Sequence, residues 1–410
     1  MVNPPTSAKD LAAAIARIAL DAFLASGRAL DFRPRQAPKI SILILLCNRA
    51  EITLSCLQSL ALGYNETPYE LILVDNGSTD RTAALLDRIE GATVLRNAAN
   101  RGFPAGVNQA AELAVGEYLL LLNNDTEVLG RSIDTAADCL DRNPDIGMVG
   151  GKVVLLDGTL QEAGCGLWQN GWSYQYARGT APDDPSAAFE RDVDYCSAAF
   201  LMTRRAAFNA LGGFDEIFSP GYFEDVDLSL RFRRLGWRVR YLPDIVLLHY
   251  ENATSATLVG VLELAQRNHR TFFARHADWL AEQPDSARRE NLLLARRADD
   301  TALNVLYVPE GFANLGPFVR TLEALDVLVT VGFPNGAIGR ESVPRTAEVV
   351  SLNSMEDFER LLADRPGYFD LALFDTEPAP QLAAVLLARG VRWAIRRGNQ
   401  FQFARGTVAS

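Results

Sequence analysis

Three polar clusters each follow a short apolar run in the first third of the chain, and their side chains are of types that bind ligands. They are Cys47-Asn48-Arg49, Asp75-Asn76-Gly77-Ser78 and Asn123-Asn124-Asp125. Any one of them also has the composition of an ordinary turn, because Asn, Asp, Gly and Ser dominate turns. The preceding apolar runs indicate neighbouring strands of an open α/β sheet, and ligands bind outside the carboxyl ends of such strands. We therefore expect the three clusters to line one crevice.

A second acidic group lies at Glu224, Asp225 and Asp227, where a helix is predicted to begin. Acidic residues at a helix N-terminus are favoured by capping and by the helix dipole, so a structural role is one interpretation. Three acids in four positions are more than one cap requires.

The segment 157–195 is rich in Gly, Trp, Tyr and Asp and is predicted to form long loops. Trp168 and Trp172 could stack on the C–H faces of an acceptor sugar, although packing within the loops is an equal alternative. Asp194, just before an apolar strand, is a further candidate to face an acceptor.

Apolar runs alternate with helical stretches around these clusters, which is typical of an α/β fold. Strands are predicted at 40–46, 70–74, 93–96, 117–122, 146–155, 238–241 and 245–249, with helices at 52–60, 80–90, 106–114, 132–142 and 224–235. Before them, residues 7–30 are predicted to form an amphipathic helix with one narrow polar stripe. That helix is expected to dock on its own domain or on a second subunit.

The alternation restarts after residue 300, with strands predicted at 303–308, 326–331, 348–352, 371–374 and 391–395 and helices at 354–363 and 380–388. The predicted organisation is an N-terminal helix and linker (1–38), a catalytic domain (39–283), a helical connector (284–300) and a small α/β domain of unknown role (301–410). The last of these carries no motif that suggests chemistry.

The composition and charge exclude several classes of protein. The 410 residues carry a net charge of −11 and no long basic run, so nucleic acid is not an expected partner. The five cysteines show no CxxC spacing, which is typical of reduced thiols in a cytosolic protein. No apolar run reaches the roughly 18 residues of a membrane span. We expect a cytoplasmic protein or one at the membrane periphery.

Five segments between Ile40 and about Leu248 resemble glycosyltransferase family 2, a large family of inverting enzymes with the GT-A fold. They are LILVDNGSTD (71–80), NRGFPAGVNQA (100–110), LLLLNNDTEV (119–128), GGFDE (212–216) and YFEDVDLSLRFRRLGW (222–237). One motif alone would be weak evidence, but these five occur in the order and at the spacing of the family. We therefore expect an α/β protein with a GT-A type mixed, mostly parallel sheet flanked by helices, an N-terminal amphipathic helix and a second small α/β (Rossmann-like) C-terminal domain.

The resemblance implies a site for a nucleotide-sugar donor. Asp75 matches the carboxylate that binds the donor's base in the family, and a carboxylate, which only accepts hydrogen bonds, suits the ring N–H of uracil or thymine. The loop at 100–102 matches the family's nucleotide-flanking loop, where glycine lets the backbone approach the donor closely. The expected donor-binding residues are Asn48, Asp75, Asn100, Arg101, Gly102, Asn123 and Asn124.

The resemblance also implies a divalent metal, Mn²⁺ or Mg²⁺. Asp125 matches the last residue of the family's Asp-x-Asp motif, which ligates a metal that bridges the donor phosphates. The chain departs from the motif at Asn123 and Asn124, which add no charge. His249, followed six residues later by Ser255, resembles the second metal ligand, and a satisfied buried histidine is the alternative.

The family places its catalytic base in the pair Glu224-Asp225, where Asp225 is the better match and Glu224 the alternative. The implied reaction is a single displacement with inversion, from a UDP- or dTDP-sugar to a hydroxyl of a glycan, lipid-linked or protein acceptor. Such a reaction belongs to the assembly of surface polysaccharide, O-antigen or glycoprotein glycans. Because the Gln-x-x-Arg-Trp signature of processive synthases is absent from its expected place, we expect a non-processive hexosyl- or deoxyhexosyltransferase.

Two other functions are compatible with an α/β domain of this kind. A nucleotidyltransferase would carry a glycine-rich, basic phosphate loop directly after the first strand, and residues 47–51 (CNRAE) are not such a loop. A catalytically inactive nucleotide-sugar binding module is the other alternative, and the presence of Asp75, Asp125, Asp225 and His249 argues against it.

Overall fold

The computed structural model describes residues 8–250, 258–286, 303–311, 315–325, 327–333, 342–365, 367–397 and 400–403. The chain divides into two compact units, the first mainly up to Ala277 and the second from Asp278 onward. Two short segments inside the first range, Leu167–Asn170 and Asp183–Glu190, belong to the second unit. Most of the expected connector at 284–300, and Ser255, lie outside the described residues.

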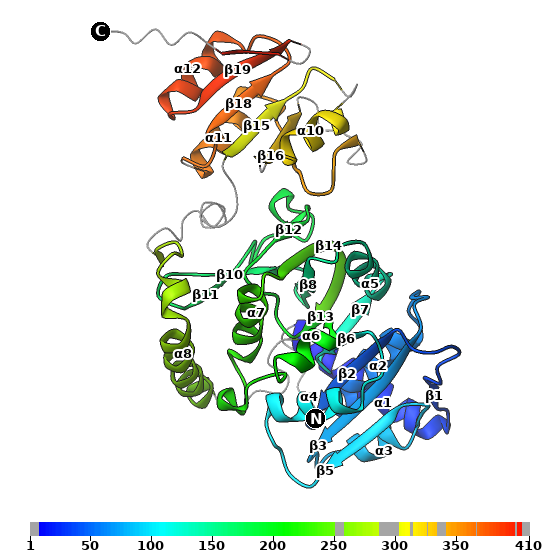
Figure 1. The fold of residues 1–410 in the computed structure, drawn as a ribbon. Coiled ribbons are helices and arrows are strands. Elements are labelled where there is room, and N and C mark those ends of the chain that lie inside the picture. Colours follow the sequence, from blue (N-terminus) through cyan, green and yellow to red (C-terminus); the bar gives the residue numbers. More distant parts are fainter. Residues whose placement is uncertain are drawn as a thin grey trace. The chain divides into compact units, whose positions relative to one another are not determined.

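A ten-stranded mixed sheet forms the centre of the first unit (Figure 1). Its strands are β2 (Ile40–Leu46), β3 (Tyr69–Asn76), β5 (Thr93–Asn97), β6 (Tyr118–Leu122), β7 (Thr126–Leu129), β8 (Ile146–Leu155), β9 (Leu160–Ala163), β12 (Arg191–Asp192), β13 (Phe200–Arg204) and β14 (Arg238–His249). Their order is β12-β14-β8-β13-β6-β2-β3-β5, with β7 paired to β14 and β9 to β8. The half β6-β2-β3-β5 is parallel throughout, as expected for α/β units.

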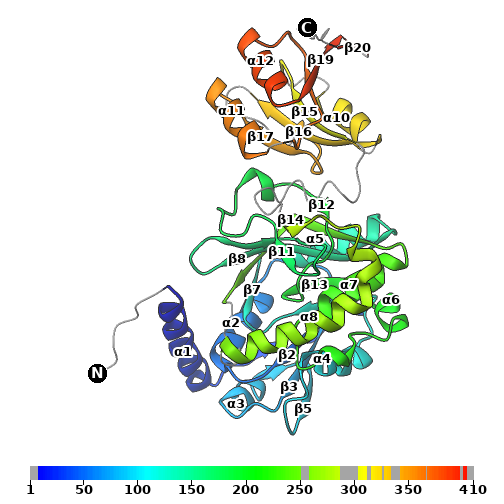
Figure 2. The same ribbon diagram turned by 90° about the vertical axis from the view of Figure 1, so that its left-hand side faces the viewer.

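Helices cover both faces of this sheet (Figure 2). The helices of the first unit are α1 (Ala8–Ser26), α2 (Ala50–Ala61), α3 (Thr82–Leu86), α4 (Phe103–Leu113), α5 (Ser132–Arg142), α6 (Arg205–Ala210), α7 (Glu224–Arg234) and α8 (Leu258–Leu280), with the 3-10 turn η2 (Glu216–Phe218). The 3-10 turn η1 (Pro185–Ala187) belongs to the second unit. Helix α4 packs on β2 and β3, where Gly106 lies so close to Leu45 that a Cβ on the glycine would be 2.3 Å from Leu45 Cδ1.

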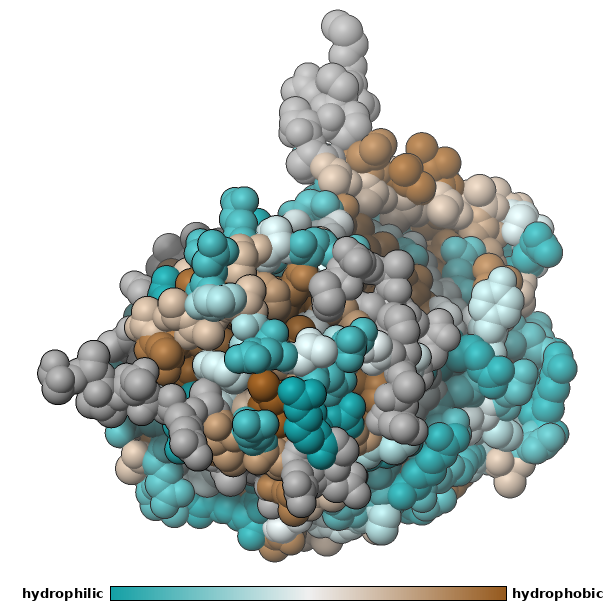
Figure 3. Space-filling view, turned by 90° about the horizontal axis from the view of Figure 1, so that it is seen from above, coloured by the Kyte–Doolittle hydropathy of each residue, from teal (hydrophilic) through white to brown (hydrophobic). Residues whose placement is uncertain are grey.

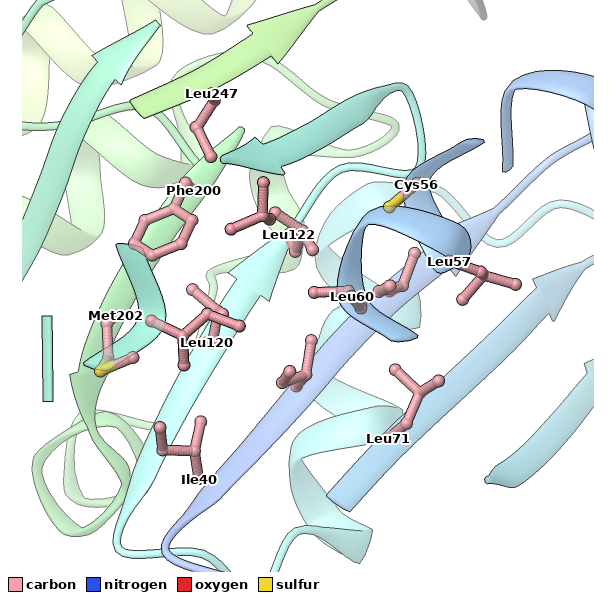
Figure 4. Close-up of a cluster of buried hydrophobic side chains, with 14 of the residues drawn as sticks. Ile40, Cys56, Leu57, Leu60, Leu71, Leu120, Leu122, Phe200, Met202 and Leu247 are labelled. Atoms are coloured by element: carbon pink, nitrogen blue, oxygen red, sulfur yellow. The ribbon is translucent and has the colours of Figure 1, made fainter. Parts of the chain in front are cut away.

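The main core of the first unit lies between the sheet and helices α2 and α5. Alternate residues of each strand point to this face, as the two-residue period of a strand requires. In Figure 4, Ile40, Leu71 and Leu120 from three strands point toward Leu57 and Leu60 of α2. Each such fully buried side chain contributes about 1.5–3 kcal/mol by leaving water, so this face fixes α2 against the strand ends that carry the polar clusters.

Three local predictions differ from the structure. The helix expected at 80–90 is only α3, after which β4 (Ile89–Glu90) pairs with β1 (Leu30–Asp31) in a separate two-stranded sheet. The two short strands expected at 238–241 and 245–249 are one strand, β14, interrupted by a register shift between Leu242 and Val246. The expected long loops at 157–195 contain β9, β12 and a small sheet of β10 (Cys165–Leu167) and β11 (Ser173–Gln175).

Helix α1 docks on α2, burying Ala16 and Leu20. Its opposite side leaves Leu11, Ile15 and Ile18 exposed, so the helix has a second apolar stripe that the first unit does not cover. No helix within the described residues has both the length and the apolar character needed to cross a bilayer.

The second unit contains a six-stranded sheet in the order β17-β16-β15-β18-β19-β20. Its strands are β15 (Leu303–Val308), β16 (Val327–Phe333), β17 (Glu348–Ser351), β18 (Leu371–Phe374), β19 (Arg392–Arg397) and β20 (Gln400–Phe403), with helices α10 (Leu315–Glu323), α11 (Met355–Asp364) and α12 (Pro380–Ala388). All pairs are parallel except β19–β20. A central first strand with parallel strands added on each side is the order of a doubly wound fold, which confirms the expected Rossmann-like domain.

Hydrophilic residues cover much of the face seen in the space-filling view, and hydrophobic ones gather there in smaller patches (Figure 3).

Candidate active site

Asn48 ties together the carboxyl ends of β2 and β3, which are parallel neighbours. Its side-chain Oδ1 accepts hydrogen bonds from the backbone N–H groups of Thr79 at 2.8 Å and Asp80 at 3.2 Å. Asn48 and Arg49 have φ angles of 62° and 64°, a region that few residues other than glycine adopt. The amide oxygen of Asn48 thus holds the loop after β3 in place.

Asp75 lies at the end of β3 and is 7% exposed. Its Oδ1 accepts a hydrogen bond from the backbone N–H of Ser78 at 2.9 Å. Within the described part of the chain the second carboxylate oxygen accepts no hydrogen bond and is available to a ligand. Because a carboxylate only accepts hydrogen bonds, such a ligand must present a donor.

Asn76, which the sequence analysis did not single out, organises the loop after β5. Its Nδ2 donates to Oδ1 of Asn100 at 2.9 Å, and its Oδ1 accepts from the backbone N–H of Arg101 at 3.0 Å. At Gly102, φ is +85° and a Cβ would lie 2.9 Å from Cα of Pro220, so only glycine fits. The structure therefore brings the predicted residues 100–102 beside the end of β3.

The three residues of the cluster after β6, Asn123-Asn124-Asp125, differ in burial and in hydrogen bonding. Asn124 is buried, and its Nδ2 donates to Oγ1 of Thr53 on α2 at 2.9 Å, which directs this predicted donor-binding residue into the protein. Asn123 is partly buried, and its side chain makes no hydrogen bond to any described residue. Asp125 is 4% exposed and begins the connection to β7.

His249 lies beside Asp125 because β14 and β7 are antiparallel, with His249 opposite Thr126. The Nε2 of His249 is 3.1 Å from Oδ1 of Asp125. On the other side of the ring, Nδ1 is 2.6 Å from Oε1 of Gln161. The pairing of two strands thus brings together the two predicted metal ligands, which are 124 positions apart in the sequence.

The hydrogen-bond partners of His249 make the pair a suitable cation site. An amide oxygen and a carboxylate oxygen are both acceptors, so a neutral ring that donates from Nδ1 to Gln161 turns the Nε2 lone pair toward the Asp125 carboxylate. Two acceptors this close are stabilised when a cation lies against both, and adjacent ligands of an octahedral ion at ~2.1 Å are about 3 Å apart. Among the described residues no group of three or more His, Cys, Asp or Glu side chains could hold a metal, so the phosphates of a donor would supply further ligands.

Glu224 and Asp225 form a buried acidic pair at the start of α7. Asp225 accepts hydrogen bonds from the backbone N–H groups of Ala198 at 3.2 Å and Val226 at 2.8 Å. Burial raises the pKa of Asp225 to about 6 despite these hydrogen bonds. Burial and the nearby charge of Asp225 raise the pKa of Glu224 well above its ordinary range, and its Oε2 is buried without a hydrogen-bond partner among the described residues.

Glu162 on β9 connects the metal-ligand pair to the acidic pair, and sequence reasoning missed it. It is 3% exposed, follows Gln161, and accepts hydrogen bonds from Oγ and N of Ser197 at 2.9 and 3.3 Å. Ser197 precedes Ala198, which donates to Asp225. Burial raises the pKa of Glu162, and the hydrogen bonds that it accepts from Ser197 and Cys165 oppose that rise. No periodic pattern of apolar residues marks β9, which lies in the region predicted to form loops.

The two tryptophans predicted at the acceptor site differ in exposure. Trp168 is 1% exposed, so the structure corrects the expectation that its ring offers a face to a sugar: the ring is packed inside the protein. Trp172 is 36% exposed and stacks on His269, with ring centroids 4.2 Å apart. Its other neighbour, Phe223, is the residue before Glu224, and their rings are 5.9 Å apart.

Asp194 is also buried, and its Oδ1 lies 3.6 Å from Nη1 of Arg233 in the last turn of α7. Asp225 is at the opposite end of this eleven-residue helix, and at 1.5 Å per residue the backbone of Arg233 is roughly 12 Å from that of Asp225 along the axis. The role of Asp194 toward an acceptor stays a prediction.

Comparisons with known proteins identify the family of the chain. The family model described as "Glycosyl transferase family 2" matches residues 41–211. An O-antigen biosynthesis protein of Myxococcus xanthus is 30% identical over 271 residues, which are 63% of this chain and 21% of that protein. An N-acetylglucosaminyl-diphospho-decaprenol L-rhamnosyltransferase of Mycobacterium tuberculosis is 31% identical over 253 residues, 54% of this chain and 80% of that protein.

Among solved structures, a mannosyltransferase from Pyrobaculum calidifontis in complex with GDP-Man and Mn²⁺ is 18% identical, with a TM-score of 0.42 over 65% of this chain and 73% of that chain. The chain thus spans about a fifth of the first relative and four fifths of the second. The matched residues 41–211 include β2, β3 and β6 and the clusters that follow them. On the family model and the rhamnosyltransferase relative together, the chain belongs to glycosyltransferase family 2.

Proposed function

We propose that this chain is a metal-dependent, inverting glycosyltransferase that moves a sugar from a UDP- or dTDP-sugar to a hydroxyl group of a lipid-linked glycan. The observation that carries the proposal is the arrangement at the carboxyl edge of the sheet. A buried Asp125–His249 pair is linked through Gln161 and Glu162 to a buried Asp225 whose pKa is raised to about 6.

The donor site in this proposal has two parts. The unused carboxylate oxygen of Asp75 accepts the ring N–H of a uracil or thymine base, and the loop held by Asn76 passes along the nucleotide. Asp125 and His249 hold Mn²⁺ or Mg²⁺, which when bound stabilises the negative charge that develops on the departing nucleoside diphosphate.

Asp225 is the proposed catalytic base. With a pKa of about 6 it is mostly ionised at neutral pH yet more basic than an ordinary aspartate, as general-base catalysis favours. The acceptor O–H gives its proton to Asp225 while its oxygen bonds to the anomeric carbon and the bond from that carbon to the diphosphate breaks. Glu224 is the weaker candidate, because burial and the charge of Asp225 raise its pKa well above the ordinary range and its Oε2 has no hydrogen-bond partner among the described residues.

The acceptor is proposed to lie against the exposed face of Trp172. The stack with His269 fixes the orientation of this ring, and the contact with Phe223 places it near the acidic pair. Aromatic faces of this kind pack well on the apolar faces of sugars. The name of the Mycobacterium relative supports a deoxyhexose such as rhamnose as the transferred sugar and a polyprenyl-diphosphate-linked sugar as the acceptor. The proposed enzyme adds one or a few sugars and is not processive.

A thermal-shift screen of nucleoside diphosphates and nucleotide sugars, with and without Mn²⁺, tests the proposal. We expect UDP- or dTDP-compounds to raise the melting temperature when Mn²⁺ is present, because ligands stabilise the state they bind, and a chelator to remove the effect. Asp125→Ala should act like the chelator even at saturating Mn²⁺. Asp138→Ala, on the exposed surface of α5, is the matched control. Equal donor binding by the wild type with and without metal contradicts the proposed metal site.

A further inference from the structure

Among the described residues, Gln161 is the hydrogen-bond partner of His249 on the ring edge opposite Asp125. Its Oε1 lies 2.6 Å from Nδ1 of His249, and Nε2 on the far side of the ring lies 3.1 Å from Asp125. The ring is 7% exposed. Its two nitrogens are therefore both engaged inside the protein, and the choice of tautomer decides which nitrogen carries a lone pair.

The backbone places Gln161 there by a β-bulge. In the β8–β9 pairing, Val153 is opposite Glu162 and Val154 is opposite Leu160, which leaves Gln161 as an extra residue between them. A bulge of this kind turns a side chain out of the regular alternation of a strand, and bulges are frequent next to active sites. Here Glu162 points to Ser197 and Gln161 reaches His249.

The two tautomers of His249 have opposite consequences. If Nδ1 carries the proton, it donates to the Gln161 oxygen, and the Nε2 lone pair faces the same space as the Asp125 carboxylate. If Nε2 carries the proton, it donates to Asp125, and the ring occupies the carboxylate oxygen that a cation needs. Both neighbours of the ring only accept, so the amide oxygen of Gln161 favours the first tautomer and the carboxylate of Asp125 favours the second. The contact of Nδ1 with Gln161, at 2.6 Å, is shorter than the contact of Nε2 with Asp125, at 3.1 Å, which supports the first tautomer.

We propose that Gln161 is a positioning residue, which holds His249 in the tautomer protonated at Nδ1 so that Nε2 and the Asp125 carboxylate together present a divalent-cation site. The inference rests on the proposed use of Asp125 and His249 as cation ligands. It adds an outer partner to that site, and such partners change metal affinity 10–100-fold when they are removed.

Nitrogen-15 NMR of histidine in the metal-free full chain tests the proposal directly, since the chain has three histidines. The spectrum is recorded in mildly alkaline buffer, where ordinary imidazoles are neutral, and His249→Ala identifies the signal. We expect the wild type to show His249 protonated at Nδ1. In Gln161→Leu, the Nε2-protonated form should become populated. A wild-type ring protonated at Nε2 overturns the proposal, whatever the variants do.

Binding of Mn²⁺ in the presence of UDP, measured by electron paramagnetic resonance, supplies a second readout. We expect Gln161→Leu to weaken Mn²⁺ binding about 10–100-fold, while Gln161→Glu, whose carboxylate also accepts from Nδ1, keeps wild-type affinity or exceeds it. Gln283→Leu is the matched control, because it removes a buried amide that donates to the Trp279 carbonyl in the second unit.

The outcomes separate this inference from the proposed function. If His249→Ala weakens Mn²⁺ binding and Gln161→Leu does not, the metal site stands and the role of Gln161 is wrong. If His249→Ala leaves Mn²⁺ binding unchanged, the metal site itself is wrong. Loss of binding in both Gln161→Leu and Gln161→Glu, in folded proteins, indicates a packing role and also contradicts the proposal.

Discussion

At the scale of single residues, the chemistry depends on how two adjacent carboxyl groups differ. Asp225 accepts two backbone hydrogen bonds, whereas Glu224 leaves a buried oxygen without a partner among the described residues. Hydrogen bonds to a carboxylate favour its charged form, and burial without them favours the neutral form. The two environments therefore favour ionisation of Asp225 over ionisation of Glu224.

Replacement of the proposed base tests this assignment. Asp225→Asn keeps the shape of the side chain and one acceptor oxygen, which can accept one of the two backbone hydrogen bonds that Oδ2 and Oδ1 of Asp225 accept from Ala198 and Val226, so α7 should still form. It removes the proton acceptor, and transfer should fall by roughly 10²–10⁴ while donor affinity is nearly unchanged. Steady-state kinetics and calorimetry of donor binding measure the two quantities. If Asp225→Asn transfers sugar at the wild-type rate and Glu224→Gln does not, Glu224 is the base.

The pH dependence of transfer should report the same group. A base must be deprotonated to act, so kcat/KM should rise with pH through about 6, the pKa of Asp225, and level off above it. Burial is the main cause of this raised pKa, and the negative charge of Glu162 adds to it. Glu162→Gln removes that charge, so the pKa of Asp225 should fall and the rising limb should move to lower pH.

Glu112→Gln, an exposed change on α4, is the control for the pH profile and should leave it in place. A limb that does not move in Glu162→Gln contradicts the electrostatic link between Glu162 and Asp225.

Sequence reasoning identified the site residues that lie in contiguous motifs and missed those that are positioned by contacts between strands. Asp75, Asp125 and Asp225 follow strands or open a helix within contiguous motifs, so their positions could be predicted locally. Gln161 and Glu162 depend on the register between β8 and β9 and on one extra residue in it. Cross-strand register is set by tertiary packing, which no window of sequence around Gln161 contains.

At the scale of elements, Asp227 explains the third acidic residue of the α7 motif. Its side chain is fully buried and accepts from Arg231 at 2.7 Å, Arg275 at 2.9 Å and the His276 ring at 2.9 Å. Although burial opposes it, these hydrogen bonds and charges lower the pKa of Asp227. Asp227 therefore fastens α8, which also carries His269 beneath Trp172, to the helix that begins with the proposed base.

Replacement of Asp227 should lower the stability of the protein more than it changes the reaction. Asp227→Ala removes one partner of a buried charge network, which should lower the free energy of unfolding by about 3 kcal/mol. Asp215→Ala is the control, since Asp215 pairs with the same Arg275 near the surface and such pairs contribute about 0–1 kcal/mol. Urea unfolding of both variants gives the comparison, and equal losses would contradict the anchoring role.

The helices and strands that could be predicted are those that pack their apolar residues against one hydrophobic core. Strand β2 and helices α5 and α12 begin and end where the sequence indicates, because their apolar residues follow a single period. The prediction of a helix at 80–90 is wrong in its second half, because β4 pairs with β1 there. Leu30 of β1 lies opposite Ile89, 59 residues later in the chain. That distant pairing overrides the local helical pattern.

At the scale of the whole molecule, the two units are not consecutive along the chain. The segment Asp183–Glu190 belongs to the second unit, where η1 packs on β17 and the backbone N–H of Glu190 donates to the carbonyl of Arg345 at 2.9 Å. This segment leads into β12 and then to the turn at 197–198 that contacts Glu162 and Asp225. A single domain boundary after residue 280 would therefore separate Asp183–Glu190 from the rest of the second unit.

A chain that ends at Asp300 separates the roles of the two units. Asp75, Asp125 and His249 all lie in the first unit, so we expect the shortened protein to bind UDP with Mn²⁺ with an affinity within a few-fold of that of the full chain, as measured by calorimetry.

Phe189, 1% exposed in the full chain, should become exposed in the shortened protein, and limited proteolysis should cut within 183–190. Phe189→Ala should then cost about 3 kcal/mol of unfolding free energy in the full chain and almost nothing in the shortened one. An equal cost in both chains shows that Phe189 is buried by the first unit, and loss of UDP binding by a folded shortened protein shows that the donor site needs the second.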